Sequence, residues 1–326
     1  MMLAWKIVPA LACGNTVVLK PAEQAPLSAM YFGKLVQEAA LPPGVVNIIP
    51  GLGSEAGKTL AEHMDIDKVA FTSSTNTGRI IMRSAATNLK NITLECGGKS
   101  PCIVFADADI DQAVKWTHMC IMSNQGEICT STSRIYVQEE IYEEFLHRFF
   151  AKARSQKTGD PFTEETTVGA IVSKLQYDKI LDYIEQGKQN GARILAGSVQ
   201  HGSKGYFIEP TVFADTTEYM AIVREEIFGP VVTISKFKTQ DEAVKKANDT
   251  PYGLAAAIFT QKVDRAHIVA RKLQAGMVWI NSSQDSHFGI PFGGYKLSGI
   301  GRELGKYALD AYTQAKAVHV NLGSTL

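Results

Sequence analysis

The chain has 326 residues, 45% of them hydrophobic and 20% charged, and its 33 Lys and Arg residues balance 33 Asp and Glu residues. This composition is typical of a globular protein with room for two domains. The zero net charge argues against a nucleic-acid-binding surface, and no apolar run reaches the roughly 18 residues of a membrane helix. We therefore expect a small-molecule substrate as partner, with no nucleic acid and no membrane.

The five cysteines are odd in number and irregularly spaced, and no CxxC pair occurs. A disulfide framework and a zinc site are therefore both disfavoured, and we predict no metal. A reducing compartment, the cytoplasm, fits best. Residues 1–6 lack the charged start and cleavage site of a signal peptide and read as the middle of a helix. This favours a truncated chain, for which an organelle signal upstream stays open.

Strands and helices alternate from residue 14 to residue 97. Short β-branched runs bounded by Gly or Pro indicate buried strands, and apolar residues at three- to four-residue spacing indicate helices. This alternation predicts a doubly wound parallel sheet of the Rossmann type. We expect strands at 14–20, 45–49, 68–72 and 92–95, with helices from 26 up to a stop at Pro42, at 54–63 and at 76–86.

The pattern continues with new elements after Gly97-Gly98. We predict three regions: a partial NAD-binding domain (1–97), an α/β catalytic domain (98–297) and a C-terminal segment (298–326). Residues 317–322 alternate like an edge strand that would pair with a neighbouring subunit. In the middle region we expect strands at 102–105, 134–138 and 277–280, helices at 109–123 and 141–157, and further βα pairs around 173–190, 231–237 and 252–260.

Cys129 and Glu95 carry the chemistry. A thiolate adds readily to a carbonyl, and attack on an aldehyde followed by hydride loss leaves a thioester. A carboxylate within reach of a water can act as the base that releases this thioester. The simpler interpretations are a buried apolar cysteine and a surface charge at a strand end. The polar loop around Cys129 and the glycines after Glu95 favour the catalytic interpretation.

Two places are candidates for dinucleotide binding. Ser74 lies between a strand and a helix, where backbone N–H groups and the helix dipole can hold a phosphate. Lys20 and Glu23 follow the first strand at its carboxyl edge, and Glu23 can accept hydrogen bonds from ribose hydroxyls. A carboxylate there would repel a 2′-phosphate, so NAD is favoured over NADP. Taken singly, Ser74 is an ordinary helix cap and Glu23 a helix-start carboxylate.

Six segments together resemble the aldehyde dehydrogenase superfamily over essentially the whole chain, closest to its non-acylating, broad-range NAD-dependent group. The chain thereby resembles an α/β enzyme with a partial Rossmann-type domain and an α/β catalytic domain. The segments are GNTVVLKPAE (14–23), PPGVVN (42–47), LE with GGKSP (94–101), NQG with Cys129 (124–129), EEIFGPV (225–231) and PFGGYK with SG (291–299).

The resemblance implies a role for each matching residue. Cys129 matches the nucleophile and Glu95 the general base. Lys6 and Glu303 match a proton path to that base, and Phe292 falls at the substrate entrance. The C-terminal segment matches a strand of oligomer assembly, so a homodimer or homotetramer is implied. Cofactor contacts fall on Lys20 and Glu23 (adenosine ribose), Ser74 (phosphate), and Glu226 and Phe228 (nicotinamide ribose).

The sequence departs from the family in three places. The family's oxyanion-hole asparagine lies in a segment ahead of Met1, and the loss of one such donor typically costs about 10²–10³ in rate. Ser73 replaces the usual glycine of the phosphate turn, which would weaken NAD binding if that backbone needs a positive φ. Glu127 replaces a glutamine, and its charge would raise the pKa of the Cys129 thiol if it faces the sulfur.

Three functions remain open at this stage. The first is NAD-dependent oxidation of an aldehyde to a carboxylic acid through a Cys129 thioester, with Glu95 activating the water. The second is a truncated, inactive paralogue that acts at most as an oligomer partner. The third is an acylating enzyme that passes the thioester to coenzyme A, which Glu95 argues against because such enzymes need no hydrolytic base.

Overall fold

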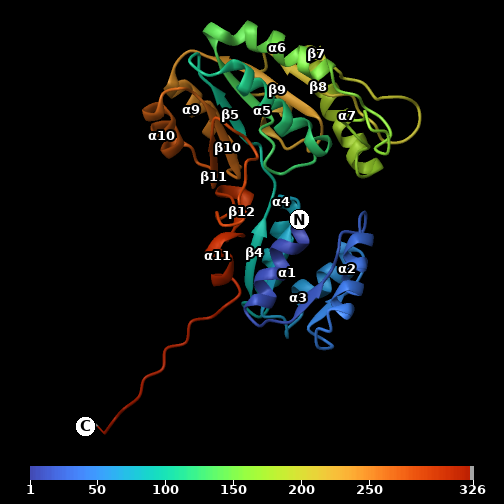
Figure 1. Cartoon of the computed structure of the whole chain (residues 1–326), viewed down its shortest axis with the longest axis vertical. Helices are drawn as coiled ribbons and strands as arrows, with labels where there is room; N and C mark the ends of the chain where they lie inside the picture. Colours follow the sequence, from blue (N-terminus) through green and yellow to red (C-terminus); the bar gives the residue numbers. More distant parts are fainter. Residues whose placement is uncertain (324–326) are drawn as a thin grey trace.

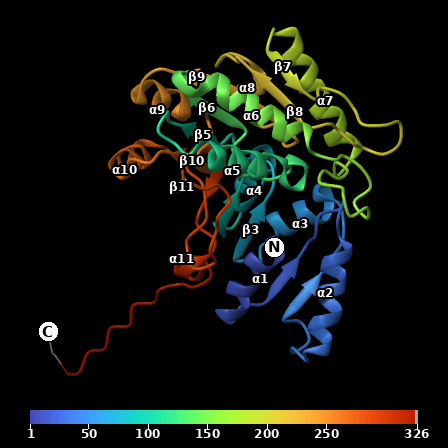
Figure 2. The same cartoon turned by 45° about the horizontal axis from the view of Figure 1, so that its top comes forward.

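A computed structural model describes residues 1–323 and shows two lobes (Figures 1 and 2). The smaller lobe contains the N-terminal elements together with a short C-terminal strand and helix. The larger lobe contains a seven-stranded sheet with helices on its two faces. The chain passes from the smaller lobe to the larger one after β4 (Asn91–Glu95), so the end of this strand lies at the junction between the lobes.

The smaller lobe holds two separate pieces of sheet. β1 (Val17–Leu19) pairs in parallel with β2 (Val46–Ile48), while β3 (Lys68–Thr72) pairs in parallel with β4. The prediction of one continuous parallel sheet across these four strands is therefore wrong. Within residues 1–323 no strand hydrogen-bonds to both pieces, and adjacency in sequence does not dictate adjacency in a doubly wound sheet. The helices are α1 (Met2–Ala12), α2 (Leu27–Glu38), a π-turn at Gly53–Gly57, α3 (Lys58–Glu62) and α4 (Thr75–Ala85).

The larger lobe is built on a sheet of order β11-β10-β5-β6-β9-β8-β7, parallel except at β7. Five of these strands lie where the sequence predicts strands. β7 and β8 were not predicted, because each has four residues and neither shows a regular alternation. The strands are β5 (Pro101–Val104), β6 (Arg134–Gln138), β7 (Arg193–Ala196), β8 (Thr211–Ala214), β9 (Val231–Phe237), β10 (Ala255–Phe259) and β11 (Met277–Ile280).

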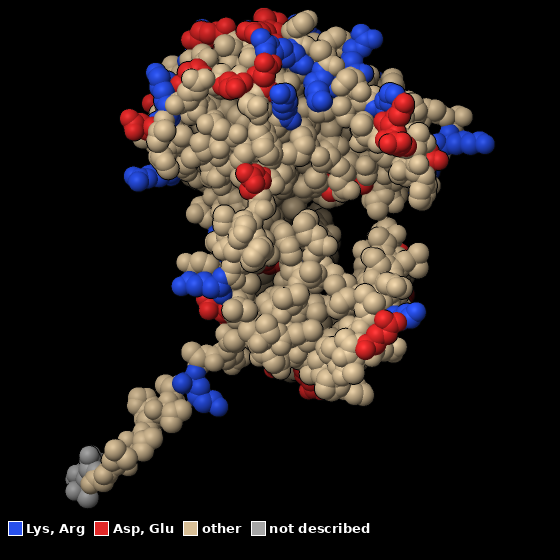
Figure 3. All heavy atoms as spheres, viewed as in Figure 1, with Lys and Arg blue, Asp and Glu red and all other residues tan. Residues whose placement is uncertain are grey.

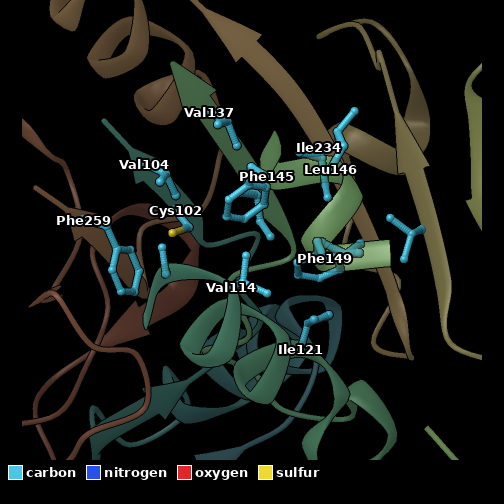
Figure 4. Packing of buried hydrophobic residues seen from close by; sticks show 14 of the residues in the cluster. Cys102, Val104, Val114, Ile121, Val137, Phe145, Leu146, Phe149, Ile234 and Phe259 are labelled. Carbon is cyan, nitrogen blue, oxygen red and sulfur yellow. The ribbon is translucent and has the colours of Figure 1, made fainter. Parts of the chain in front are cut away.

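Helices cover both faces of this sheet and enclose its core (Figure 4). Phe145 and Phe149 of α6 pack against β5 and β6, and their rings stack with centroids 5.8 Å apart. Apolar residues on the facing side of α5 complete the layer, so strand, helix and helix meet in one buried cluster. The helices are α5 (Ile110–Met122), α6 (Tyr142–Arg154), α7 (Lys174–Gln189), α8 (Ala221–Arg224), α9 (Gln240–Asn248) and α10 (Val263–Lys272), with 3₁₀ turns at Ser123–Gly126 and Glu139–Ile141.

The C-terminal residues return to the smaller lobe. After a 3₁₀ turn at Lys296–Ser298, β12 (Gly299–Ile300) pairs antiparallel with β4, opposite Glu95 and Leu94. α11 (Gly305–Asp310) follows and contacts α1. Residues 317–322 extend from the body of the molecule and form no strand in the single chain (Figure 1). Within the described residues, no strand of the same chain therefore pairs with the predicted edge strand.

Both lobes expose large apolar side chains. On the smaller lobe, Leu27 is 81% exposed and Tyr31 61% exposed on α2, and Ile80 of α4 is 56% exposed; on the larger lobe, Phe162 is 98% exposed and Tyr219 93%. In the view of Figure 3, charged side chains gather over the larger lobe and are sparse on the smaller one.

The core of the larger lobe sets its stability. We expect Phe149→Ala to lower the free energy of unfolding by about 3–5 kcal/mol, because Phe149 is completely buried and its loss leaves a cavity. Phe162→Ala is the matched control, since Phe162 is 98% exposed. Urea unfolding followed by circular dichroism measures both. Equal midpoints for the two variants would contradict the packing described here.

Candidate active site

The loop that carries Cys129 is held in an unusual backbone conformation. α5 ends at Met122, and Asn124, Gln125 and Gly126 then have φ angles of 50°, 57° and 73°. Such left-handed residues turn the chain sharply and cost energy where a side chain is present. Gly126 has no alternative, because a Cβ there would come within 2.1 Å of the carbonyl oxygen of Gly229. The turn delivers Cys129 to the junction between the lobes.

Glu95 ends β4 and is only 3% exposed. Within residues 1–323 neither of its carboxylate oxygens has a hydrogen-bond partner. Burial, and to a smaller degree the carboxylate of Glu303, raises the pKa of Glu95 to about 9, against the opposing charges of Lys6 and Arg302. Glu95 is therefore protonated at neutral pH in this state, with free acceptor atoms that face the interior of the site.

Cys129 lies beside the loop that follows Glu95. A Cβ at Gly98 would come within 2.5 Å of the carbonyl oxygen of Cys129, so only glycine permits this approach. Burial, and to a smaller degree the carboxylates of Glu226 and Glu95, raises the pKa of the Cys129 thiol to about 12, against backbone N–H groups that lower it. The structure thus places Glu95, the predicted base, close enough to Cys129, the predicted nucleophile, for its charge to act on the pKa of the thiol.

The condition under which Glu127 would raise the pKa of the Cys129 thiol is not met. Its Oε1 accepts a hydrogen bond from the backbone N–H of Val172 at 3.3 Å, away from the thiol. The carboxylates that act on the pKa of Cys129 are those of Glu226 and Glu95. The backbone geometry of the loop, which composition does not reveal, sets this orientation.

Glu226 closes the site from the larger lobe. Its Oε1 accepts a hydrogen bond from the N–H of Gly98 at 2.9 Å, and its carboxylate fills the space where a side chain at Gly97 would lie. Burial raises the pKa of Glu226. Phe228, two residues on, has a left-handed φ of 59°. The 226–228 loop therefore lies directly against the Gly97-Gly98 turn.

Lys20 and Glu23 form an ion pair at 3.2 Å. Lys20 also donates to the carbonyl oxygen of Gly51, and Glu23 accepts from the N–H of Gly53 at 3.2 Å. Backbone hydrogen bonds, including the one from Gly53, lower the pKa of Glu23. The pair therefore lies beside the π-turn at Gly53–Gly57, with Glu23 exposed and Lys20 largely covered.

Ser74 caps α4, accepting a hydrogen bond from the N–H of Thr77 at 3.3 Å. α4 has eleven residues, so its N-terminus carries unpaired N–H groups and a positive dipole end. Ser73 does not have a positive φ, so the condition under which its side chain would strain the turn is not met.

Lys6 and Glu303 form an ion pair between α1 and the C-terminal segment, and Lys6 also donates to the Oγ1 of Thr72 at 2.7 Å. Glu303 is 4% exposed, and its charge acts on the pKa of Glu95. Phe292 exchanges two backbone hydrogen bonds with Glu303 and packs on Trp5 with ring centroids 4.7 Å apart. Phe292 is therefore largely buried on this side of the site.

Three residues near the site were missed by the sequence analysis. Gln176 of α7 donates to the carbonyl oxygens of Ile227 and Phe228 at 2.9 and 2.7 Å, and Lys179 donates to that of Glu226 at 3.1 Å. Their three-residue spacing on one helix face is the signal that points to them. Lys99 is 1% exposed, and burial lowers its pKa to about 7.

Comparison with known proteins identifies the class. The aldehyde dehydrogenase family profile matches residues 1–318, and the chain belongs to this family. It is 57% identical over 327 residues to an aldehyde dehydrogenase of Alternaria alternata, covering all of this chain and 66% of that protein. It is 53% identical to aldehyde dehydrogenase 1A1 of Oryctolagus cuniculus, covering 98% of this chain and 65% of that protein.

Solved structures agree with these relatives. The NAD⁺ complex of an aldehyde dehydrogenase from Bacillus cereus superposes with a TM-score of 0.97 at 51% identity, covering 99% of this chain and 66% of that one. An indole-3-acetaldehyde dehydrogenase in complex with NAD⁺ also gives a TM-score of 0.97, at 45% identity, covering 99% of this chain and 66% of that one. The chain thus has the aldehyde dehydrogenase fold and spans about two thirds of the length of these relatives.

Membrane-spanning helices and metal-binding clusters are both absent from the described part of the chain. In residues 1–323 no helix has both the length and the hydrophobicity required to cross a bilayer. The same residues contain no group of three or more His, Cys, Asp or Glu side chains arranged to hold a metal ion.

The buried carboxyl of Glu95 should make stability depend on pH. Its pKa is raised from a usual value of 4.5 to about 9, so the folded state binds the proton more tightly than the unfolded state does. Wild type should therefore lose stability relative to Glu95→Gln as pH rises from about 5 to 8, by at least about 1.4 kcal/mol, the equivalent of one pKa unit. Urea unfolding at the two pH values measures the difference. Glu164→Gln, at an exposed site, is the control, and parallel behaviour of the two variants would contradict the prediction.

Proposed function

We propose that the protein oxidises an aldehyde to a carboxylic acid with NAD⁺ as hydride acceptor. The observation that carries this proposal is the position of Cys129 against the Gly97-Gly98 turn, within electrostatic reach of Glu95 and Glu226. A nucleophilic thiol and a carboxyl with free acceptor atoms at one lobe junction are what the two half-reactions require. Family membership supports the same reaction.

The reaction begins when the Cys129 thiol releases its proton to solvent and its sulfur attacks the aldehyde carbonyl carbon, forming a C–S bond as the C=O π bond opens to an alkoxide. NAD⁺, when bound, would supply the acceptor for a hydride from this carbon, which would leave a Cys129 thioester. Glu95, once deprotonated, takes a proton from a water whose oxygen attacks the thioester carbon. The C–S bond breaks, the carboxylic acid leaves and the thiol is regenerated.

Proton transfer from Glu95 is proposed to run through Glu303 and Lys6. The Glu303 charge acts on the pKa of Glu95, and Glu303 is itself paired with Lys6, which contacts Thr72. Phe292, buried against Trp5, is proposed to line the substrate entrance beside this path.

Five residues are proposed to hold NAD. Lys20 and Glu23 would meet the adenosine ribose, and Ser74, at the N-terminus of α4, a phosphate oxygen. Glu226 and Phe228 would meet the nicotinamide ribose, next to the Gly97-Gly98 turn. The residues fit this group, because the α4 N-terminus offers unpaired N–H groups and Glu23 presents an exposed carboxylate.

The finer organisation is also a proposal: an NAD-binding region at 1–97, a catalytic region at 98–297 and a C-terminal segment at 298–326. Homo-oligomer formation is supported by the exposed Val318 and Val320 in the alternating segment. A cytoplasmic location is supported by the five cysteines, all of which are unpaired.

Activity should depend on both catalytic residues in different ways. We expect the purified chain to reduce NAD⁺ with a simple aliphatic aldehyde, and Cys129→Ala to abolish this. Glu95→Gln should keep a single-turnover burst of NADH while its steady-state rate falls by about 10²-fold or more, because only the hydrolytic step needs the base. Stopped-flow absorbance separates the two phases. Equal NADH formation by Cys129→Ala and wild type would refute the role of Cys129, and flat traces from both would refute the proposal and favour a role as an inactive oligomer partner.

Cofactor choice should depend on Glu23. Glu23→Gln removes the negative charge that would repel a 2′-phosphate, so NADP⁺ should bind about tenfold more tightly, a change of about 1.4 kcal/mol. NAD⁺ affinity should change less, since the amide still offers a hydrogen-bond acceptor. Titration calorimetry with both dinucleotides measures this. An unchanged ratio of the two dissociation constants would place the ribose elsewhere.

A further inference from the structure

The nucleophile loop needs an external support. Asn124 and Gln125 both have left-handed backbones although neither is glycine, and such conformations persist only where the surroundings hold them. Within the loop, the side chain of Asn124 donates to the carbonyl oxygen of Glu127 at 3.0 Å, and the N–H of Glu127 donates back to Asn124. These two bonds close the turn but do not attach it to the rest of the lobe.

Two side chains of the loop make that attachment. The Oε1 of Gln125 accepts from the N–H of Gly169 at 3.1 Å, and the Oε1 of Glu127 accepts from the N–H of Val172 at 3.3 Å. Both acceptors are side chains of the turn, and both donors are backbone groups of one short segment, 169–172.

The segment 169–172 is itself fixed. Val168 and Ile171 are buried, with 0% and 3% exposure. Ile171 donates to the carbonyl oxygen of Tyr206 at 2.8 Å, and Gly159 donates to that of Val168 at 3.1 Å. Ser173, directly after the segment, caps α7. The donors that meet Gln125 and Glu127 are therefore anchored on both sides.

We propose that Glu127, assisted by Gln125, is a positioning residue for the nucleophile: it fastens the Cys129 loop to the anchored segment 169–172 and so keeps the backbone of Cys129 against the Gly97-Gly98 turn. The proposal rests on the proposed function for Cys129, but its structural part is independent of turnover. The acceptor oxygen, rather than the charge alone, is the group that does this. Glutamine at this position offers the same acceptor, whereas leucine of similar size offers none.

Alkylation of Cys129 by iodoacetamide tests the proposal without any need for dehydrogenase activity. In Glu127→Leu the loop should open more often and the buried thiol should react about tenfold faster, the change in population that loss of a hydrogen bond to a charged group is expected to give. Glu127→Gln should react within about twofold of wild type because it keeps an acceptor. Gln125→Leu should accelerate the reaction in the same direction as Glu127→Leu. Mass spectrometry of the Cys129 peptide measures each rate, with the Cys13 peptide of the same sample as internal reference.

Glu242→Leu is the matched control, since the Oε2 of Glu242 accepts from the N–H of Lys238 at 2.8 Å in another part of the lobe. It should leave the Cys129 rate unchanged, and thermal unfolding establishes that each variant is folded. Equal Cys129 rates in wild type and Glu127→Leu would overturn the proposal, and so would an acceleration that Glu127→Gln shares in full. If wild type shows no NADH formation but the alkylation rates behave as expected, the proposed reaction fails and the positioning role stands.

Discussion

The site depends on one stretch of backbone without side chains, Gly97-Gly98. It allows three parts of the chain to meet: the end of β4 with Glu95, the loop with Cys129 and the loop with Glu226. A Cβ at Gly97 would overlap the Glu226 carboxylate, and one at Gly98 would overlap the carbonyl oxygen of Cys129. At Gly98 the obstacle is backbone, so a side chain there would displace the Cys129 loop, whereas at Gly97 the obstacle is the end of the flexible Glu226 side chain, which could turn away.

This close approach has an electrostatic consequence. Glu95, Cys129 and Glu226 are desolvated together, and burial is the largest cause of the raised pKa in each case. Burial therefore favours the protonated form of each of these three groups, which lowers the cost of desolvating them together. A site in this state must lose protons before it reacts, and the proposed path through Glu303 and Lys6 would carry them.

The positions of the strands and helices were easier to predict from the sequence than the pairing of the strands. The runs at 68–72, 134–138 and 277–280 are β-branched or apolar and bounded by turn residues, so their strands were predictable. The separation of β1 and β2 from β3 and β4 was not, because strand order is decided by tertiary packing rather than by local pattern. β7 and β8 gave a weaker signal than the equally short run 277–280, because Arg193 opens the one and Thr211 the other, so neither run is apolar throughout.

In the site, too, the residues were predictable but their arrangement was not. Cys129 and Glu95 were identified by residue type and context, but the direction of a side chain depends on backbone angles that composition does not reveal. Glu127 shows this most clearly. Its charge would act on the thiol only if it faced the sulfur, and the left-handed turn at Asn124 and Gln125 points its carboxylate at Val172 instead. The carboxylate of Glu127, two residues before the nucleophile, thus bonds to the backbone rather than acting on the sulfur. Besides burial, the groups that raise the pKa of the thiol are Glu226 and Glu95. These two residues come from the other two parts of the chain that meet at Gly97-Gly98.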